Sequence, residues 1–158
     1  MKKRKSKGST LPMVIIALVV LAILSGIIAT TIQAANAQTL RVTEFMNAKY
    51  VATSGTQLAL GAYYENDGNN NLYKLFENRA MGKDKSTTAV TANHVFENGT
   101  AQITMTGKFE PGSQMSSRYN ITIETIAKIG LSEDNYKHVV EFNWETNGIR
   151  NESGGVDN

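Results

Sequence analysis

The sequence predicts an α+β protein in which a long N-terminal α-helix packs on a C-terminal antiparallel β-meander of three or four strands. Three observations predict this class. An uncharged apolar run begins at Leu11, no proline interrupts the chain from there through Tyr64 except Pro12, and the C-terminal half alternates apolar with polar residues. The 158 residues suffice for one domain with an appendage. Without cysteine, the chain has no disulfide, thiolate nucleophile or Cys-based zinc site.

Basic charge is concentrated in a leader peptide at residues 1–8. This leader holds five of the sixteen Lys and Arg residues and no acidic residue. The remaining chain therefore carries 11 basic against 14 acidic residues, a net charge of −3. A slightly acidic body without a basic stripe does not attract a phosphate backbone, so no nucleic acid is expected as a partner.

Residues 11–32 are predicted to form a transmembrane helix with membrane lipid as a partner. The segment has 22 positions without a charge. At about 1.5 Å per residue it spans roughly 33 Å, the thickness of a bilayer's hydrocarbon core. The preceding Lys and Arg residues place the N-terminus in the cytoplasm and the rest of the chain outside the cytoplasmic membrane.

Small residues within the apolar segment allow neighbouring helices to approach closely in a membrane or filament. They are Ala17, Ala22, Ser25, Gly26 and Ala29.

Three interpretations of the N-terminal region remain open from the residues themselves. Ala35-Asn36-Ala37 before Gln38 fits the cleavage site of a secretory signal, although the apolar run exceeds the roughly 7–15 residues of such signals. A plain single-pass anchor explains the apolar run alone. The third interpretation starts from Gly8, which closes the basic leader directly before Ser9.

A Lys-rich leader ending in Gly8, then a small residue and an unbroken apolar helix, resembles the class III signal of type IV pilins and pseudopilins. The resemblance implies a pilin-like fold, cleavage by a prepilin peptidase between Gly8 and Ser9, and N-methylation of Ser9. Most pilins carry a glutamate as the fifth residue after the cut, where this chain has Met13. That departure is similar to PilX/GspK-type minor pilins, as is the stretch Tyr50–Leu60, and the resemblance covers residues 1–64.

The resemblance implies a structural minor subunit of a type IV pilus or related pilin-like filament, at its tip or in its initiation. Such a subunit is membrane-inserted before assembly and later lies at the cell surface in the pilus. Its partners are other pilin subunits, through the N-terminal helix, and the prepilin peptidase. The alternative is a single-pass or secreted extracytoplasmic binding domain with no filament role.

The helix is expected to extend over residues 9–64, about 80 Å at 1.5 Å per residue, with an amphipathic outer half. Its apolar face is predicted from the spacing of Leu40, Val51, Leu58 and Ala62. Gly55 is expected to mark a close-packing point or a bend. The Asn-rich sequence that follows predicts a connecting loop over residues 65–90, with at most a short helical turn around Leu72, Leu75 and Phe76.

The sheet is predicted over residues 91–146, from apolar–polar alternation in Ala101–Phe109, Tyr119–Ile129 and Val140–Glu145. Asn98-Gly99 is a hairpin signal that adds a fourth strand before it. The sheet should cover Leu40–Leu60 and bury five of its own large apolar residues. These are Ile103, Ile121, Ile123, Phe142 and Trp144. The Gly/Asn/Ser-rich residues 147–158 are predicted to be a flexible tail.

No catalytic, metal-binding or cofactor-binding pattern is present in the sequence. His94 and His138 are the only histidines, and neither has the spacing of a metal or nucleophile motif. Both fall in predicted strands near apolar neighbours, where a structural histidine that is partly buried or at the rim of the core is expected. The sequence therefore predicts no enzyme and no cofactor.

Overall fold

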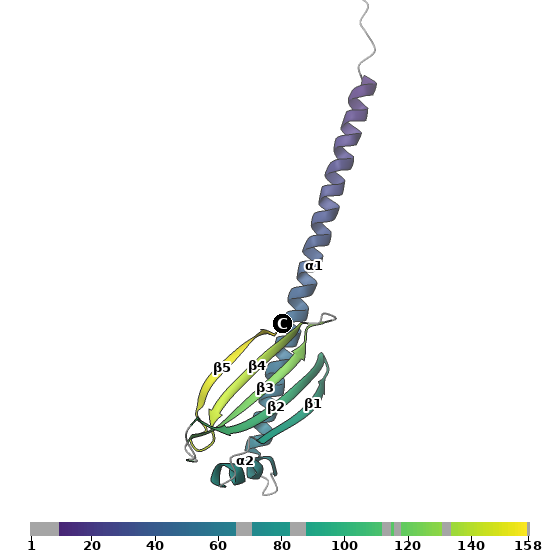
Figure 1. Ribbon diagram of the computed structural model, residues 1–158. Helices are drawn as coiled ribbons and strands as arrows, with labels where there is room; N and C mark the ends of the chain where they lie inside the picture. The colour runs from purple at the N-terminus through teal and green to yellow at the C-terminus, as the bar shows by residue number, and fades with distance from the viewer. Residues whose placement is uncertain are drawn as a thin grey trace, which may run out of the picture. The chain divides into compact units, whose positions relative to one another are not determined.

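The computed structural model describes residues 10–65, 71–82, 88–111, 115, 118–130 and 134–157 (Figure 1). Two helices precede a single five-stranded sheet. The elements are α1 Thr10–Tyr64, α2 Asn71–Met81, β1 Thr88–Phe96, β2 Gly99–Phe109, β3 Tyr119–Lys128, β4 Asn135–Asn143 and β5 Ile149–Asp157. The chain divides into two compact units, Met1–Val42 and Thr43–Asn158, each described by itself.

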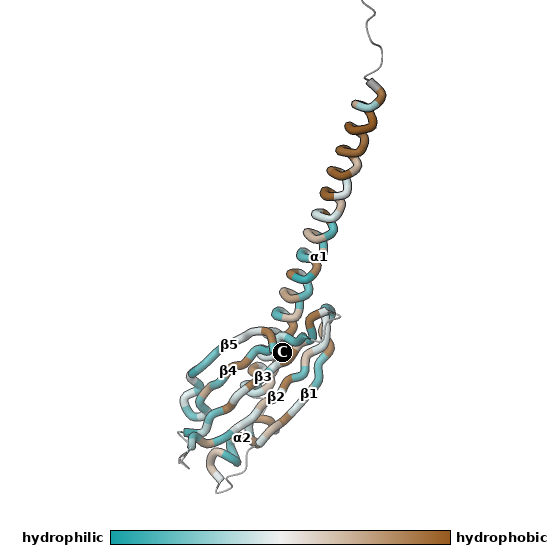
Figure 2. The backbone as a smooth tube through the Cα atoms, turned by 45° about the horizontal axis from the view of Figure 1, so that its top comes forward, coloured by the Kyte–Doolittle hydropathy of each residue, from teal (hydrophilic) through white to brown (hydrophobic). Residues whose placement is uncertain are grey.

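The first unit contains the N-terminal part of α1. Every residue from Leu11 to Val42 is helical and exposed. Figure 2 shows that hydrophobic residues dominate its N-terminal turns and that polar residues become frequent further along. Pro12 lies in the first turn, where a missing backbone N–H leaves no helical hydrogen bond unmade.

In the second unit, the C-terminal part of α1 packs against the sheet through a face of mostly small residues. The buried positions recur every three or four residues, as one face of a helix requires. They are Ala48, Val51, Ala52, Gly55, Thr56, Ala59 and Tyr63. The predicted apolar face is therefore wrong in three of its four members, because Leu40, Leu58 and Ala62 are exposed. Small side chains let the helix axis approach the sheet, whereas leucines at the same positions would hold it away.

Gly55 is the point of closest approach between α1 and the sheet. A Cβ atom built on Gly55 would lie 2.7 Å from Thr125 Cγ2 and 3.4 Å from both Ala101 Cβ and Ile103 Cγ1. The helix continues through this position without a break. Of the two predicted roles, close packing is confirmed.

The sheet is an antiparallel meander in which each strand pairs with the next, in the order β1-β2-β3-β4-β5 (Figure 1). The predicted hairpin between β1 and β2 is present, with Phe96 opposite Gly99. The predicted count of three or four strands is too low, because Ile149–Asp157 forms β5 instead of a flexible tail. Its Gly- and Asn-rich sequence has little intrinsic preference for a strand, but the free edge of β4 offers backbone partners along its length.

The core lies between the sheet, α1 and α2. The five residues predicted to be buried are all buried, which confirms the alternation. The prediction of a connecting loop over residues 65–90 is wrong in part, because Asn71–Met81 forms α2. Phe76 and Ala80 of this helix are buried in the same core. Tyr63 joins the elements there, because its ring lies 5.3 Å from that of Phe142 and 6.2 Å from that of Phe76.

Candidate functional site

The apolar segment of α1 has the properties of a membrane-spanning helix. The large apolar side chains of Leu11–Ile32 are between 50% and 75% exposed, and this helix is long and apolar enough to cross a membrane. Hydroxyl groups in the segment have acceptors within the helix itself. Ser25 Oγ donates to Leu21 O at 2.8 Å, and Thr31 Oγ1 donates to Ile27 O at 2.8 Å. No polar side-chain group of these two residues would therefore enter lipid unpaired.

Four of the five predicted small packing residues share one side of α1. With 3.6 residues per turn, Ala22, Ser25, Gly26 and Ala29 fall within a sector of about 100°, and Ala17 lies outside it. Ala22 and Gly26 form one small-xxx-small pair, and Ser25 and Ala29 form a second. A Cβ atom at Gly26 would meet nothing within 4 Å, so this surface is open to a partner helix.

The predicted processing site lies outside the described residues. Gly8 and Ser9 precede the first described residue, Thr10, and cleavage and N-methylation stay predictions. Met13, at the position of the usual pilin glutamate, is helical and 75% exposed.

His138 belongs to a buried hydrogen-bond network between the sheet and α1. Its Nδ1 lies 2.9 Å from Thr56 Oγ1, which also lies 3.0 Å from Thr125 Oγ1 and 3.2 Å from the Ala52 carbonyl oxygen. On the other side of the ring, Nε2 lies 3.3 Å from Glu152 Oε1. Both ring nitrogens therefore have a polar partner, and neither is left unsatisfied in the core.

The contacts connect the carboxylate of Glu152, the imidazole of His138 and the hydroxyl of Thr56 in the order found in hydrolytic triads. Thr56 is only 1% exposed, however, because α1 and the sheet enclose its hydroxyl. A nucleophile must reach its substrate, and this one is sealed inside the core. The network therefore fixes α1 on the sheet. His94, in contrast, is exposed on β1 and packs edge-to-face on Phe96 at 4.6 Å.

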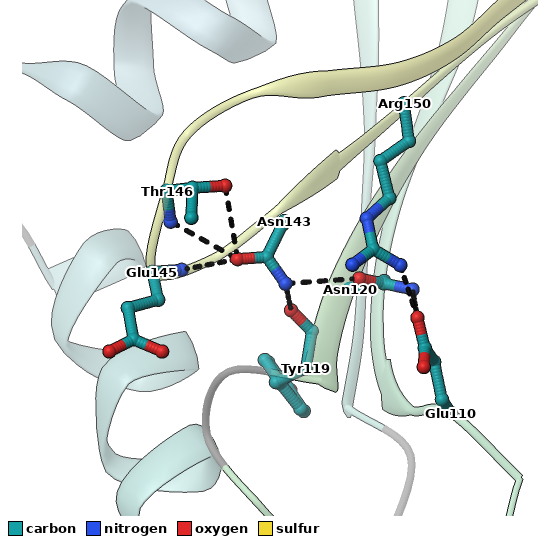
Figure 3. Close-up of polar contacts among 7 residues, drawn as sticks. All are labelled: Glu110, Tyr119, Asn120, Asn143, Glu145, Thr146 and Arg150. Carbon is teal, nitrogen blue, oxygen red and sulfur yellow. Dashed lines mark hydrogen bonds and ion pairs between the residues drawn. The ribbon is translucent and has the colours of Figure 1, made fainter.

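Asn143 is the centre of a second polar cluster, at the end of β4 (Figure 3). Its Nδ2 donates to Tyr119 O and to Asn120 Oδ1, both at 3.3 Å. Its Oδ1 accepts from the backbone N–H groups of Glu145 and Thr146, both at 3.1 Å, and from Thr146 Oγ1 at 3.2 Å. Five contacts on one 2%-exposed amide hold the β4–β5 connection against the start of β3.

An ion pair between Arg150 and Glu110 extends this cluster from β5 to the end of β2 (Figure 3). Asn120 Nδ2 also donates to Glu110 Oε1, at 3.4 Å. The hydrogen bond from Arg150 is the main reason why the pKa of Glu110 is lowered. The side chains of Asn143, Asn120, Glu110 and Arg150 all contact other protein groups, so the cluster serves to attach β5.

Neither polar cluster was predicted from the sequence. Thr56, Thr125, His138 and Asn143 are far apart along the chain and follow no motif. A local signal existed for Asn143 alone, which lies between Phe142 and Trp144, where a buried polar group needs a partner.

Metal-binding geometry is absent from the described part of the chain, in which no three His, Asp or Glu residues come close enough to hold an ion. Comparison of the sequence with protein-family models and with curated proteins finds no match. The architecture is a long N-terminal apolar helix whose C-terminal part packs on an antiparallel sheet. The fold resembles a pilin.

Proposed function

We propose that this chain is a structural minor subunit of a type IV pilus or a related pilin-like filament. It is inserted in the cytoplasmic membrane through residues 11–32, with its N-terminus in the cytoplasm, and is then extracted into a filament. One observation carries the proposal. A single helix, α1, combines an exposed apolar N-terminal segment with a C-terminal segment that is part of a folded domain's core.

The apolar surface of Leu11–Ile32 supports both states in the proposed life of the subunit. Burial of apolar surface contributes about 25 cal/mol per Å². Because these side chains are at least half exposed, most of this surface is left for lipid or for neighbouring helices to cover. The same residues therefore stabilise the chain in the membrane before assembly and in a helical filament core afterwards.

The small-residue face supports contact with other subunits through α1. In lipid, helices gain little from apolar burial against each other, so close approach and van der Waals packing decide their association. Ala22, Ser25, Gly26 and Ala29 supply such a face. Met13 lacks the carboxylate that would pair with a neighbour's terminal amine, which favours a minor subunit at the tip over a repeating one.

The proposed role is structural. Support comes from the burial of Thr56, which in the described part of the chain is the hydroxyl arranged with a histidine and a carboxylate. Lipid, other pilin subunits and the prepilin peptidase are the proposed partners.

Intact-mass measurement of the membrane-extracted chain tests processing. Co-expression with a prepilin peptidase should yield the mass of residues 9–158 plus one methyl group, and expression without the peptidase should yield the uncut chain. Gly8→Leu should block the cut, whereas the matched variant Gly26→Ala should leave it unchanged. A chain that begins at Gln38, or one that stays uncut beside the peptidase, would refute the proposal.

Cysteine cross-linking tests assembly through the small-residue face, because the chain has no cysteine of its own. In filaments sheared from cells, Gly26→Cys should form cross-links to a second subunit that carries a cysteine at the matching depth. Leu24→Cys, on the opposite side of α1, should form far fewer. Equal cross-linking by both variants would exclude this face as the specific contact.

A further inference from the structure

The face of the sheet that points away from the core carries a polar hollow. Side chains alternate between the two faces of a strand. Since Ile103 is buried in the core, its neighbour Gln102 in β2 lies on the opposite, outer face. A hollow of about 570 Å³ crosses β1 to β4 on this outer face, a volume within the range of small-molecule pockets. Its lining includes Asn93, Thr100, Gln102, Ile126, Lys128 and Asn135.

The strand register brings chemically different side chains together in this hollow. Gln102 of β2 stands directly opposite Asn93 of β1 and Ile126 of β3. Lys128 of β3 stands directly opposite Asn135 of β4. Directly opposed side chains on one face lie close enough to contact the same ligand. The hollow therefore combines three carboxamide groups, one aliphatic side chain and one ammonium group.

The polar groups of the hollow have no partner of their own, in contrast to others on the outer face. Thr91 Oγ1 lies 3.3 Å from Thr104 Oγ1, and Lys137 Nζ lies 2.9 Å from a carboxylate oxygen of Glu124. In the described part of the chain, Lys128 forms no ion pair and the three carboxamides of the hollow form no side-chain hydrogen bond. No carboxylate of the described residues lines the hollow. Its single positive charge is therefore available to an anionic ligand.

The combination of groups defines the chemistry of this ligand. A carboxamide donates and accepts hydrogen bonds, as a hydroxyl group also does, so the two pair well. Ile126 offers an apolar contact, which suits the C–H face of a sugar ring. The ammonium group of lysine attracts a carboxylate as a point charge. A sugar that carries hydroxyl groups and a carboxylate satisfies all three requirements, and sheet faces in other folds bind oligosaccharides.

Two other ligand classes lack the groups that they need here. An extended peptide binds to unpaired backbone groups, but β2 and β3 pair with a neighbouring strand on both sides. A single-stranded nucleic acid stacks its bases on aromatic side chains, and none of the described residues that line the hollow is aromatic.

We propose that this hollow binds an acidic carbohydrate, a sugar chain with carboxylates on its rings. Lys128 pairs with a carboxylate, and Ile126 contacts the ring. Asn93, Gln102 and Asn135 exchange hydrogen bonds with the hydroxyl groups. The site lies entirely within the second unit and does not depend on the proposed filament role.

Calorimetric titration of the full chain in phosphatidylcholine nanodiscs tests the site. The ligand is trigalacturonic acid, and its methyl ester is the control, because the ester keeps every ring and hydroxyl group but has no charge. Empty nanodiscs serve as the blank. We expect saturable binding of the acid and binding of the ester that is weaker by about fivefold, the upper effect of an exposed ion pair.

Two lysine substitutions on the outer face separate the hollow from a general effect of charge. Lys128→Gln should weaken binding of the acid by about fivefold and leave binding of the ester unchanged. Lys108→Gln is the matched control, since Lys108 stands opposite Asn120, eight residues along β3 from Lys128. That is roughly 26 Å at 3.3 Å per residue, beyond the screening length of about 8 Å, so its effect should be small.

An alanine substitution tests the hydrogen bonds to the sugar. Gln102→Ala should weaken binding of the acid and of the ester alike, by about fivefold, because both keep the hydroxyl groups. Gln102, Lys108 and Lys128 are exposed, and an unchanged circular dichroism spectrum verifies that each variant folds.

Four outcomes would overturn the proposal. Absence of saturable binding of both sugars would exclude a carbohydrate site. Equal affinity for the acid and the ester would remove the charge from recognition. Equal weakening by Lys128→Gln and Lys108→Gln would indicate attraction by the net charge alone. Displacement of the acid by an equal concentration of inorganic phosphate would identify a site for simple anions.

Discussion

Replacement of Gly55 by alanine tests the close contact between α1 and the sheet. In an open helix interior, alanine is about 1 kcal/mol more favourable than glycine. At Gly55, however, the added Cβ would lie 2.7 Å from Thr125 Cγ2, closer than carbon atoms pack. Gly61, in the same helix, is the matched control, because a Cβ there would meet nothing within 4 Å. The two substitutions should therefore change the free energy of unfolding in opposite directions.

The magnitude follows from the surroundings of Thr125. Overpacking a core costs about 1–3 kcal/mol. Thr125 is fully buried, and rotation of its methyl group away from residue 55 would displace its hydroxyl from Thr56 Oγ1, now at 3.0 Å, at a cost of about 1 kcal/mol. After the gain in helix propensity, Gly55→Ala should destabilise by about 1–3 kcal/mol. Gly61→Ala should stabilise by about 1 kcal/mol.

Urea unfolding of the full chain in detergent micelles provides the measurement. Trp144 is the sole tryptophan and is buried, so its fluorescence reports the unfolding of the second unit. Thr125→Ser removes the clashing methyl group and keeps the hydroxyl. It should therefore restore most of the stability lost in Gly55→Ala, which makes the two changes non-additive. If Gly55→Ala were stabilising like Gly61→Ala, the proposed helix–sheet contact would be wrong.

Three further predictions concern the polar clusters and the buried tyrosine. Asn143→Ala should destabilise by about 2–4 kcal/mol in the same assay, because it leaves several buried groups without partners, and an effect below about 1 kcal/mol would contradict that role. Burial raises the pKa of Tyr63 above 10.0, so the unfolded chain releases this proton first and stability should fall as pH rises above 10. Tyr63→Phe should reduce that slope by up to about 1.4 kcal/mol per pH unit. The hydrogen bond from Arg150 lowers the pKa of Glu110 below 4.5, so the stabilising effect of the ionised Glu110 is present above pH 4.5 and is lost as pH falls. Glu110→Gln should remove this part of the acid dependence of stability, measured in a pH series of unfolding curves.

Local periodicity was sufficient to predict most of the sheet. Alternation with period two assigns a face to each residue without knowledge of what covers that face. Ile121, Ile123 and Phe142 were therefore predicted to be buried, and each is 0% exposed. Composition was sufficient in the same way to predict the exposed apolar segment of α1, since the run from Leu11 to Ile32 contains no charged residue.

The polar clusters were beyond sequence reasoning, because a hydrogen bond depends on where two distant side chains meet. Thr56 and His138 are 82 residues apart, and Asn143 and Asn120 are 23 apart. Each is an ordinary polar residue when taken alone. Folding brings them together, and burial then makes their pairing necessary.

The amino-acid sequence by itself determined the long helix α1, the strands β1 to β4 and the apolar face of the sheet, because these depend on the order of neighbouring residues. The tertiary structure decided which side of α1 meets the sheet and whether the C-terminal residues form a strand. Large leucines suggested one side of the helix, but Ala48, Ala52 and Gly55 are buried because only small residues permit the close approach. Ile149–Asp157 became a strand because the neighbouring edge of β4 supplies hydrogen bonds that its own propensity does not predict.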